Sequence, residues 1–84
     1  HVLVVDVRRP EEYKEGHIPG AVLVTNETIG NTTPKELPDK KATLLVYCRS
    51  GVRSKQASQK LIRLGYEKVY DFGGIISWPY EIEK

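Results

Sequence analysis

Three short apolar runs, separated by polar segments, are candidate strands, and a short mixed segment is a fourth: Val2–Val5, Ala21–Val24, Thr43–Tyr47 and Lys68–Asp71. The first run contains only β-branched and aliphatic residues. Continuous apolar runs of this length are typical of strands that are buried on both faces, as in a parallel sheet. The pattern therefore predicts a buried sheet with four strands.

Helical patterns separate these strands. Pro10 suits the first turn of a helix and begins a short segment, residues 11–14, that has acidic residues at its N-terminal end. A longer helix is predicted from Val52 to Leu64, because apolar residues recur there at positions i, i+4 and i+7 (Ala57, Leu61 and Leu64). Residues 25–42 are polar and irregular, with room for a single helical turn near Pro34–Leu37.

The alternation of strands with helices or loops predicts an α/β fold with a parallel sheet. Gly73 and Gly74 indicate a turn that ends the last strand, before a short apolar segment, residues 75–78. In open parallel sheets, functional sites form at the carboxyl ends of the strands. Four residues with ionisable or nucleophilic side chains lie at or after such ends, and we expect them together at one end of the molecule: Asp6, Arg8, Cys48 and Asp71.

Length and composition indicate one small globular domain, residues 1–84. Charged residues make up 29% of the chain, both signs are interspersed, and the formal net charge is only +2, which gives no reason to expect a nucleic-acid partner. No apolar stretch approaches the ~18 residues of a membrane span, so no membrane partner is expected. Methionine is absent, and we expect His1 not to be the native start.

Cys48, the only cysteine, follows an apolar strand and precedes a small polar loop that opens a helix. Backbone N–H groups and the positive end of a helix favour an anion at such a place, and Arg49 and Arg53 add positive charge. These effects lower a thiol pKa, and the thiolate is the nucleophile. The sequence predicts a catalytic cysteine, and the alternative is an inert buried residue at a strand end.

A single cysteine can form neither an internal disulfide nor a cysteine-based zinc site. This favours a reducing compartment, and we expect a cytoplasmic protein. No metal ion and no organic cofactor are implied by any other group of residues in the sequence.

Four groups of residues occur in a characteristic order: Asp-Val-Arg at 6–8 with Glu-Tyr at 12–13 and Gly-His-Ile-Pro-Gly-Ala at 16–21, then Tyr-Cys-Arg-Ser-Gly-Val-Arg-Ser at 47–54, Leu-Gly-Tyr at 64–66 and Gly-Gly-Ile-Ile-Ser-Trp at 73–78. Together they resemble a single rhodanese domain over almost the whole chain. The resemblance implies an open parallel sheet of four to five strands flanked by helices. The family's usual first strand and helix, before the position of Val2, are expected to be missing.

The resemblance also implies sulfur transfer by double displacement. Cys48 would take a sulfane sulfur from a small anionic donor such as thiosulfate, and its persulfide would pass that sulfur to an acceptor thiol, to a protein acceptor or to cyanide. The loop after Cys48 would bind the donor through backbone N–H groups, arginine charges and serine hydroxyls. Its expected substrate-binding residues are Arg49, Ser50, Gly51, Val52, Arg53 and Ser54.

The resemblance places Asp6 and Arg8 beside this loop, where we expect an ion pair that supports the site. His17 is expected to be a turn residue bonded to the backbone rather than a general base. Trp78 is expected to pack in the core or over the site. For Arg53, a contact with substrate and a side chain in water remain equal alternatives.

Three other functions stay open. A phosphatase or arsenate reductase of similar fold has five residues between its cysteine and arginine, whereas only four separate Cys48 from Arg53. The smaller ring fits a single sulfur better than a phosphate. A persulfide carrier or regulatory binding module is the main alternative to an enzyme, and a redox sensor that lacks an internal resolving cysteine is the third.

Overall fold

The computed structural model describes residues 1–79 and residue 82, and in this part of the chain four parallel strands form one sheet. The strands are β1 (Val2–Asp6), β2 (Val22–Leu23), β3 (Thr43–Cys48) and β4 (Lys68–Gly74). Their order across the sheet is β2-β1-β3-β4, so β1 and β3 are the central pair. The predicted α/β fold with an open parallel sheet is confirmed.

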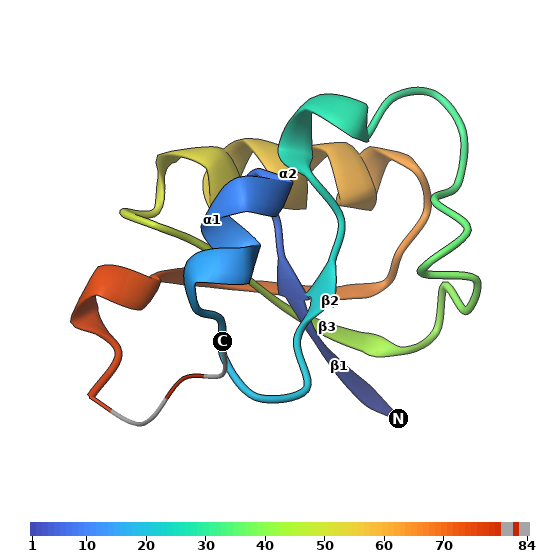
Figure 1. Cartoon of the computed structure of the whole chain (residues 1–84). Helices are drawn as coiled ribbons and strands as arrows, with labels where there is room; N and C mark the ends of the chain where they lie inside the picture. Colours follow the sequence, from blue (N-terminus) through green and yellow to red (C-terminus); the bar gives the residue numbers. More distant parts are fainter. Residues whose placement is uncertain (80–81, 83–84) are drawn as a thin grey trace.

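Two α-helices and two short 3-10 helices connect the strands: α1 (Pro10–Glu15), η1 (Asn26–Thr28), α2 (Val52–Arg63) and η2 (Ile75–Ser77). Figure 1 shows α2 lying along one face of the sheet, where it packs on β3 and β4. Its buried side is formed by Ser54, Ala57, Ser58 and Leu61. The predicted i, i+4, i+7 spacing therefore identified the face that this helix buries.

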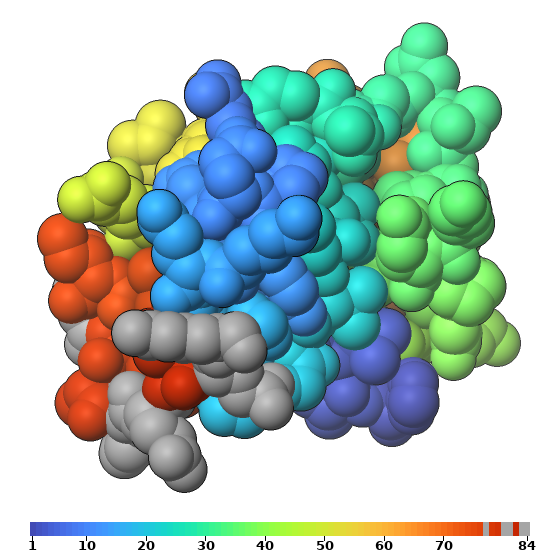
Figure 2. Space-filling view, viewed as in Figure 1, coloured from blue at the N-terminus to red at the C-terminus, as the bar shows by residue number. Residues whose placement is uncertain are grey.

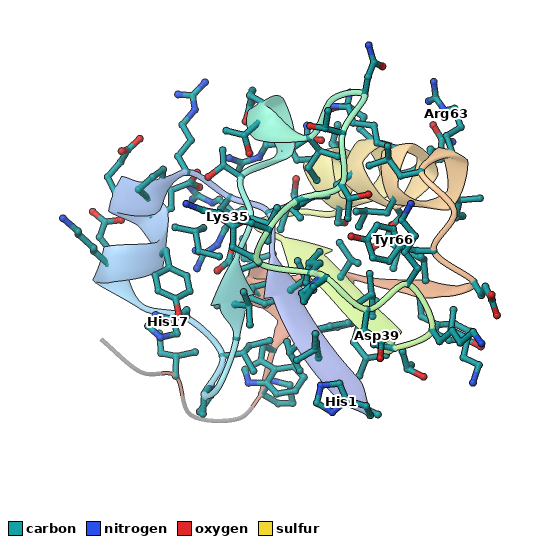
Figure 3. All side chains as sticks on the ribbon, turned by 90° about the vertical axis from the view of Figure 1, so that its right-hand side faces the viewer. His1, His17, Lys35, Asp39, Arg63 and Tyr66 are labelled. Carbon is teal, nitrogen blue, oxygen red and sulfur yellow. The ribbon has the colours of Figure 1, made fainter. Side chains whose placement is uncertain are left out.

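The main core lies between the sheet and α2. Its fully buried members include Val5, Leu44, Val46, Ala57 and Leu61. Burial of a valine or leucine side chain contributes about 1.5–3 kcal/mol. Tyr66, labelled in Figure 3, points under the loop that precedes β3, where its hydroxyl donates a hydrogen bond to the carbonyl oxygen of Leu37.

Two predicted segments differ in detail from the structure. β2 comprises two residues instead of four, because Ala21 closes a hydrogen-bonded turn with the carbonyl of Ile18, 2.9 Å away. Within residues 25–42 the 3-10 helix η1 was not predicted. At Pro34–Leu37 there is a turn, closed by a 3.0 Å bond from the Leu37 N–H to the Pro34 carbonyl.

The predicted turn at Gly73-Gly74 is wrong, because both glycines belong to β4. Val46 pairs with Asp71 and Tyr47 pairs with Gly73, so Phe72 has no counterpart on β3 and forms a bulge. A bulge changes the direction in which neighbouring side chains point and is frequent beside active sites. β4 then continues to Gly74, which pairs with Cys48.

The carboxyl ends of the strands bring three distant segments together. In Figure 2 the blue segment around α1 adjoins the yellow segment that follows β3, with the red segment that follows β4 beside them. Arg53 of α2 bonds to Glu12 of α1, and the Ile76 N–H donates to the Arg49 carbonyl oxygen at 3.2 Å. In the described part of the chain, no helix has the length and apolar character needed to span a bilayer.

Candidate active site

Cys48 is the last residue of β3, and its thiol is buried, with 1% of the residue exposed. The Gly51 N–H points at the sulfur, with the nitrogen 2.9 Å from Sγ. The Ser54 hydroxyl oxygen lies 3.6 Å from the same atom. The loop thus folds back over the sulfur and directs polar groups to it from the first turn of α2.

Two glycines allow this loop conformation. Gly51 has φ +110° at the residue before α2, in the left-handed region that favours glycine. At Gly74 a Cβ atom would lie 2.1 Å from the Arg49 carbonyl oxygen and 2.8 Å from the Ser50 Cα. The loop backbone therefore packs directly on β4, in space that a side chain at position 74 would occupy.

The site favours the ionised thiol. Burial raises the pKa of Cys48, but hydrogen bonds from the Ser54 hydroxyl and from the N–H groups of Ser54, Gly51 and Ser50 outweigh it, so that the pKa is lowered below its ordinary value. The sequence predicted this direction, although it emphasised arginine charge. The leading favourable contributions come instead from donors in the loop and α2. Ser54, expected to bind substrate, contacts the nucleophile itself.

The two loop arginines differ in their surroundings. Arg53 forms a bidentate ion pair with Glu12, with nitrogen–oxygen distances of 2.6 and 3.0 Å. Arg49 is exposed and borders a hollow of about 310 Å³. The other residues lining this hollow are Arg8, Glu12, Glu15, Ile75 and Ile76. Sequence reasoning missed Glu12 as the partner of Arg53, because 41 residues separate the two.

The remaining predicted loop residues, Ser50 and Val52, have exposed side chains. Ser50 contributes its backbone N–H to the sulfur, whereas the side chain of Val52 is directed away, with 65% of the residue exposed. The substrate-binding role of the loop side chains stays a prediction.

Asp6 and Arg8 form the expected ion pair, with Arg8 Nη2 2.7 Å from Asp6 Oδ2. Both residues are buried. Arg8 Nη2 also donates to the Gly16 carbonyl at 2.7 Å, and the Tyr47 hydroxyl donates to Asp6 Oδ2 at 2.6 Å. Tyr47 in turn accepts the Ile18 N–H at 3.1 Å. These bonds fasten β1, the turn after α1 and the residue before Cys48 to one another.

The sequence did not predict that Tyr47 takes part in this hydrogen-bond network, because Tyr47 fits the pattern of an apolar strand residue. Its hydroxyl nevertheless links two buried elements, and burial together with the bond to Asp6 raises its pKa well above the ordinary value. The hydroxyl is therefore neutral and acts as a donor to the Asp6 carboxylate. The support that this network gives to the site stays a prediction.

His17 and Trp78 have the expected surroundings. His17 Nδ1 lies 2.8 Å from the Tyr13 carbonyl oxygen, and its ring stacks on the Tyr13 ring at 3.7 Å. Figure 3 shows His17 beside the end of α1. Trp78 packs near Tyr47 and contacts Phe72, with ring centroids 5.8 Å apart.

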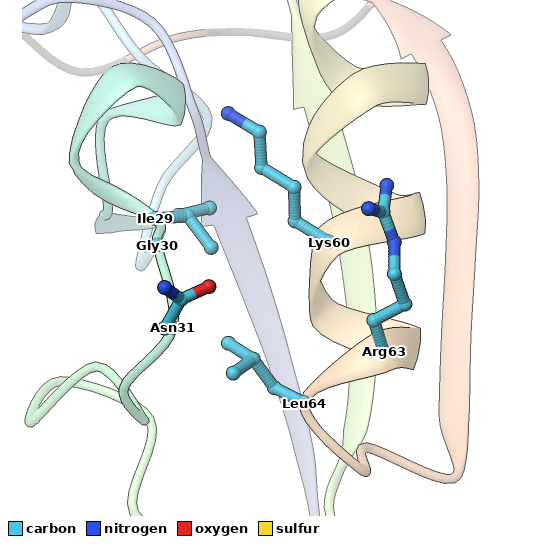
Figure 4. Close-up of a pocket in the computed structure, with 6 residues that line it drawn as sticks. All are labelled: Ile29, Gly30, Asn31, Lys60, Arg63 and Leu64. Atoms are coloured by element: carbon cyan, nitrogen blue, oxygen red, sulfur yellow. The ribbon is translucent and has the colours of Figure 1, made fainter.

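A second hollow, of about 370 Å³, lies away from Cys48, between the segment after η1 and the C-terminal half of α2 (Figure 4). It is lined by Ile29, Gly30, Asn31, Lys60, Arg63 and Leu64. The Lys60 ammonium group already donates to the carbonyl oxygen and Oδ1 of Asn26, at 3.0 and 3.1 Å. The cysteine loop therefore remains the candidate active site.

Comparison with known proteins assigns the family. The model of the rhodanese-like domain matches residues 1–79. The chain belongs to the rhodanese-like family. Thiosulfate sulfurtransferase PspE of Escherichia coli (strain K12) is 37% identical over 71 residues, which cover 84% of this chain and 68% of that protein. A sulfurtransferase of Allochromatium vinosum is 42% identical over 78 residues, covering 92% of this chain and 71% of that protein.

A solved structure supports the same assignment. A rhodanese with anions from E. coli has a TM-score of 0.88 and 32% sequence identity, with 100% of this chain and 99% of that chain covered. The expected membership of the rhodanese family is thus confirmed, and this rhodanese-like domain is a homologue of thiosulfate sulfurtransferase.

Proposed function

We propose that this rhodanese-like domain is a sulfurtransferase that moves sulfur through a persulfide on Cys48. The thiolate attacks the outer sulfur of thiosulfate, a new S–S bond forms, and the S–S bond of the donor breaks. Sulfite leaves with the electron pair of that bond. An acceptor thiolate then attacks the outer sulfur of the persulfide, and Cys48 leaves as a thiolate.

The observation that carries this proposal is the convergence of polar groups on one buried sulfur. The Gly51 N–H lies 2.9 Å from Sγ, and the pKa of Cys48 is lowered despite burial. A persulfide and its leaving thiolate are anions, so the same N–H groups favour both halves of the cycle. The expected donor-binding role of Arg49, Ser50, Gly51, Val52, Arg53 and Ser54 belongs to this proposal. The similar rhodanese from E. coli was solved with anions, which agrees with such a role.

The acceptor includes a protein thiol. Two apolar side chains flank the loop without cover: Val52 at the start of α2 is 65% exposed, and Ile76 is 69% exposed beside the Arg49 carbonyl. Exposed apolar groups around a reactive centre suit a protein surface better than a small hydrophilic acceptor. This keeps a persulfide carrier as the second candidate function. The cytoplasmic location stays a prediction, as does the expectation of no nucleic-acid or membrane partner.

The test is the intact mass of the protein after incubation with thiosulfate, with Cys48→Ser alongside. We expect the native protein alone to gain one sulfur and to lose it on addition of cyanide or a thiol. Reversal distinguishes a persulfide from a sulfinic acid, which has almost the same added mass and does not revert. A native protein that keeps a free, alkylatable Cys48 and gains no sulfur would contradict thiosulfate as donor.

A further inference from the structure

The Ser54 hydroxyl has one proton and several acceptors. Its oxygen lies 2.7 Å from Asp71 Oδ1, 3.0 Å from the Gly51 carbonyl oxygen and 3.4 Å from the Gly73 carbonyl oxygen. The Cys48 sulfur lies 3.6 Å from the same hydroxyl oxygen. A hydroxyl donates once and accepts on its lone pairs, so these groups compete for a single proton.

The carboxylate is the strongest competitor. Hydrogen bonds to ionised acceptors are shorter and about twice as strong as those between neutral groups, and the contact with Asp71 is the shortest that Ser54 makes. With the proton directed to Asp71, the Ser54 oxygen turns a lone pair toward Cys48 and accepts from the thiol S–H. This arrangement favours the protonated thiol.

Asp71 is held in position by the bulge in β4. The same oxygen, Oδ1, accepts the Gly73 N–H at 2.9 Å, across the unpaired residue Phe72. Ser54 is fully buried, so its hydroxyl has only these protein partners to choose from. The bulge thus holds the Asp71 carboxylate against the Ser54 hydroxyl, which in turn contacts the Cys48 sulfur.

We propose that Asp71 is a positioning residue that directs the hydroxyl proton of Ser54 and thereby restrains the ionisation of Cys48. When Cys48 ionises, the hydroxyl turns to donate to the thiolate and gives up its bond to Asp71. The thiolate that forms is therefore more basic, and more nucleophilic per ion, than it would be if the Ser54 hydroxyl had no bond to Asp71 to give up. Its catalytic importance rests on the proposed function.

Asp71 is itself exposed, and its bond to the Ser54 hydroxyl distinguishes it from the other charged groups near the sulfur. Arg53 on α2 is paired with Glu12 on α1, and the Cys48 charge adds to the raised pKa of Arg53. Arg8 after β1 is paired with Asp6, and Arg49 in the loop is exposed. Asp71 on β4 is the charged side chain that bonds to the hydroxyl at the sulfur.

The test measures the rate of alkylation of Cys48 by iodoacetamide against pH, with no sulfur donor present. We expect Asp71→Asn to lower the thiol pKa by about half a unit to one unit, so that alkylation below both pKa values becomes about two to four times faster, once the lower nucleophilicity of each thiolate is included. Asparagine keeps an oxygen for the Gly73 N–H, which preserves the bulge. The charge-matched control is Glu36→Gln, at an exposed position in the loop before β3, and it should leave the profile unchanged.

The double variant Ser54→Ala/Asp71→Asn separates the hydroxyl from a direct field effect. In the Ser54→Ala background, Asp71→Asn should lower the thiol pKa of Cys48 by less than half as much as it does in the native protein. An equal shift in both backgrounds would overturn the proposal, as would an unchanged or raised pKa in Asp71→Asn.

A measurement on the unmutated protein keeps the proposal testable if the variants fold poorly. Cys48 is the only cysteine, so the infrared S–H stretching band belongs to it alone. We expect the band at the lowered frequency of a thiol that donates a hydrogen bond, and a free-thiol frequency would refute the arrangement. None of these readouts involves sulfur transfer, so their failure would leave the proposed function untouched, and failure to form a persulfide would leave them unchanged.

Discussion

The ionisation of Cys48 is governed by burial and hydrogen bonding, which act in opposite directions. Burial in a medium of low dielectric constant favours the neutral thiol, whereas donors aimed at the sulfur favour the thiolate. Hydrogen bonding prevails, and the pKa of Cys48 lies below its ordinary value of 9.0. A cysteine with a similar exposed fraction but no donors would have its pKa raised and would be inert.

This balance predicts how reactivity depends on pH. The alkylation rate of Cys48 should reach half of its maximum at a lower pH in the folded protein than in the same protein unfolded in urea, because only the fold supplies the donors. The unfolded protein is the control for the intrinsic reactivity of the thiol. Equal midpoints in the two states would show that the loop does not stabilise the thiolate.

Glu12 provides a second prediction for single residues. The hydrogen bonds from Arg53 lower the pKa of Glu12 to about 2 from its ordinary value of 4.5, against the opposing effect of burial. A lowered carboxyl pKa stabilises the fold fully above pH 4.5, and this contribution is lost as the pH falls toward 2. Glu12→Gln should therefore reduce the unfolding free energy at pH 7 by less than about 1 kcal/mol, because the pair is partly exposed.

Urea denaturation at pH 7, 4.5 and 3 measures this difference, which should shrink as the pH falls. The same variant frees the Arg53 guanidinium, and if Arg53 attracts the donor, the KM for thiosulfate should decrease at pH 7. A stability difference that grows toward pH 3 would contradict the ion pair. An unchanged KM would remove Arg53 from the expected donor-binding residues.

At the scale of elements, the loop after β3 and the end of β4 depend on each other. The loop backbone packs where a side chain of Gly74 would lie, and Asp71 is positioned by the bulge that precedes the two glycines. The sequence predicted the loop, because its neighbouring strand and helix have clear patterns. It did not predict the bulge, since a glycine pair is also the commonest sign of a turn, and only the register with β3 distinguishes the two.

Gly74→Ala tests this dependence. The new Cβ would lie 2.1 Å from the Arg49 carbonyl oxygen and so force a shift of backbone against backbone. We expect a loss of about 1–3 kcal/mol in unfolding free energy, typical of overpacking, and a slower formation of the persulfide because the loop N–H groups move away from the sulfur. Thermal denaturation and single-turnover mass measurements would show both effects.

Gly30→Ala is the matched control. A Cβ at Gly30 meets no heavy atom within 4 Å, and this glycine does not have a positive φ. It should leave the rate of persulfide formation unchanged. If Gly74→Ala behaved like Gly30→Ala, the close contact between the loop and β4 would have no functional consequence.

At the scale of the molecule, the site is held by bonds between segments that are far apart in the sequence. The Tyr47 hydroxyl reaches Asp6 across 41 residues, and Arg53 reaches Glu12 across the same separation. Hydrophobic pattern and turn chemistry act over short windows, so they predicted that Asp6, Cys48 and Asp71 lie at one end of the sheet. They could not predict which polar atoms meet there, because such pairings follow from strand order and register.

Because several elements contribute to the loop, an anion bound there should stabilise the whole domain. The loop exists only when β3, β4 and α2 are packed, so the unfolded chain offers no such site. A ligand at 100 times its Kd stabilises a fold by about 2.7 kcal/mol, and about 1 kcal/mol raises the Tm of a domain of this size by about 4–8 °C. Thiosulfate at 100 times its Kd should therefore raise the Tm of Cys48→Ser, which cannot form a persulfide, by about 11–22 °C.

Two comparisons distinguish binding by the loop from a general effect of salt. Sodium chloride at equal ionic strength should raise the Tm much less, and Arg49→Ala in the Cys48→Ser background should reduce the shift, because the exposed Arg49 side chain borders the hollow beside the loop. Thiosulfate also stabilises proteins through exclusion from their surfaces, and that effect does not depend on one arginine. An equal rise in both variants would mean that the loop does not bind the donor, and would place the first step of sulfur transfer on a different class of donor.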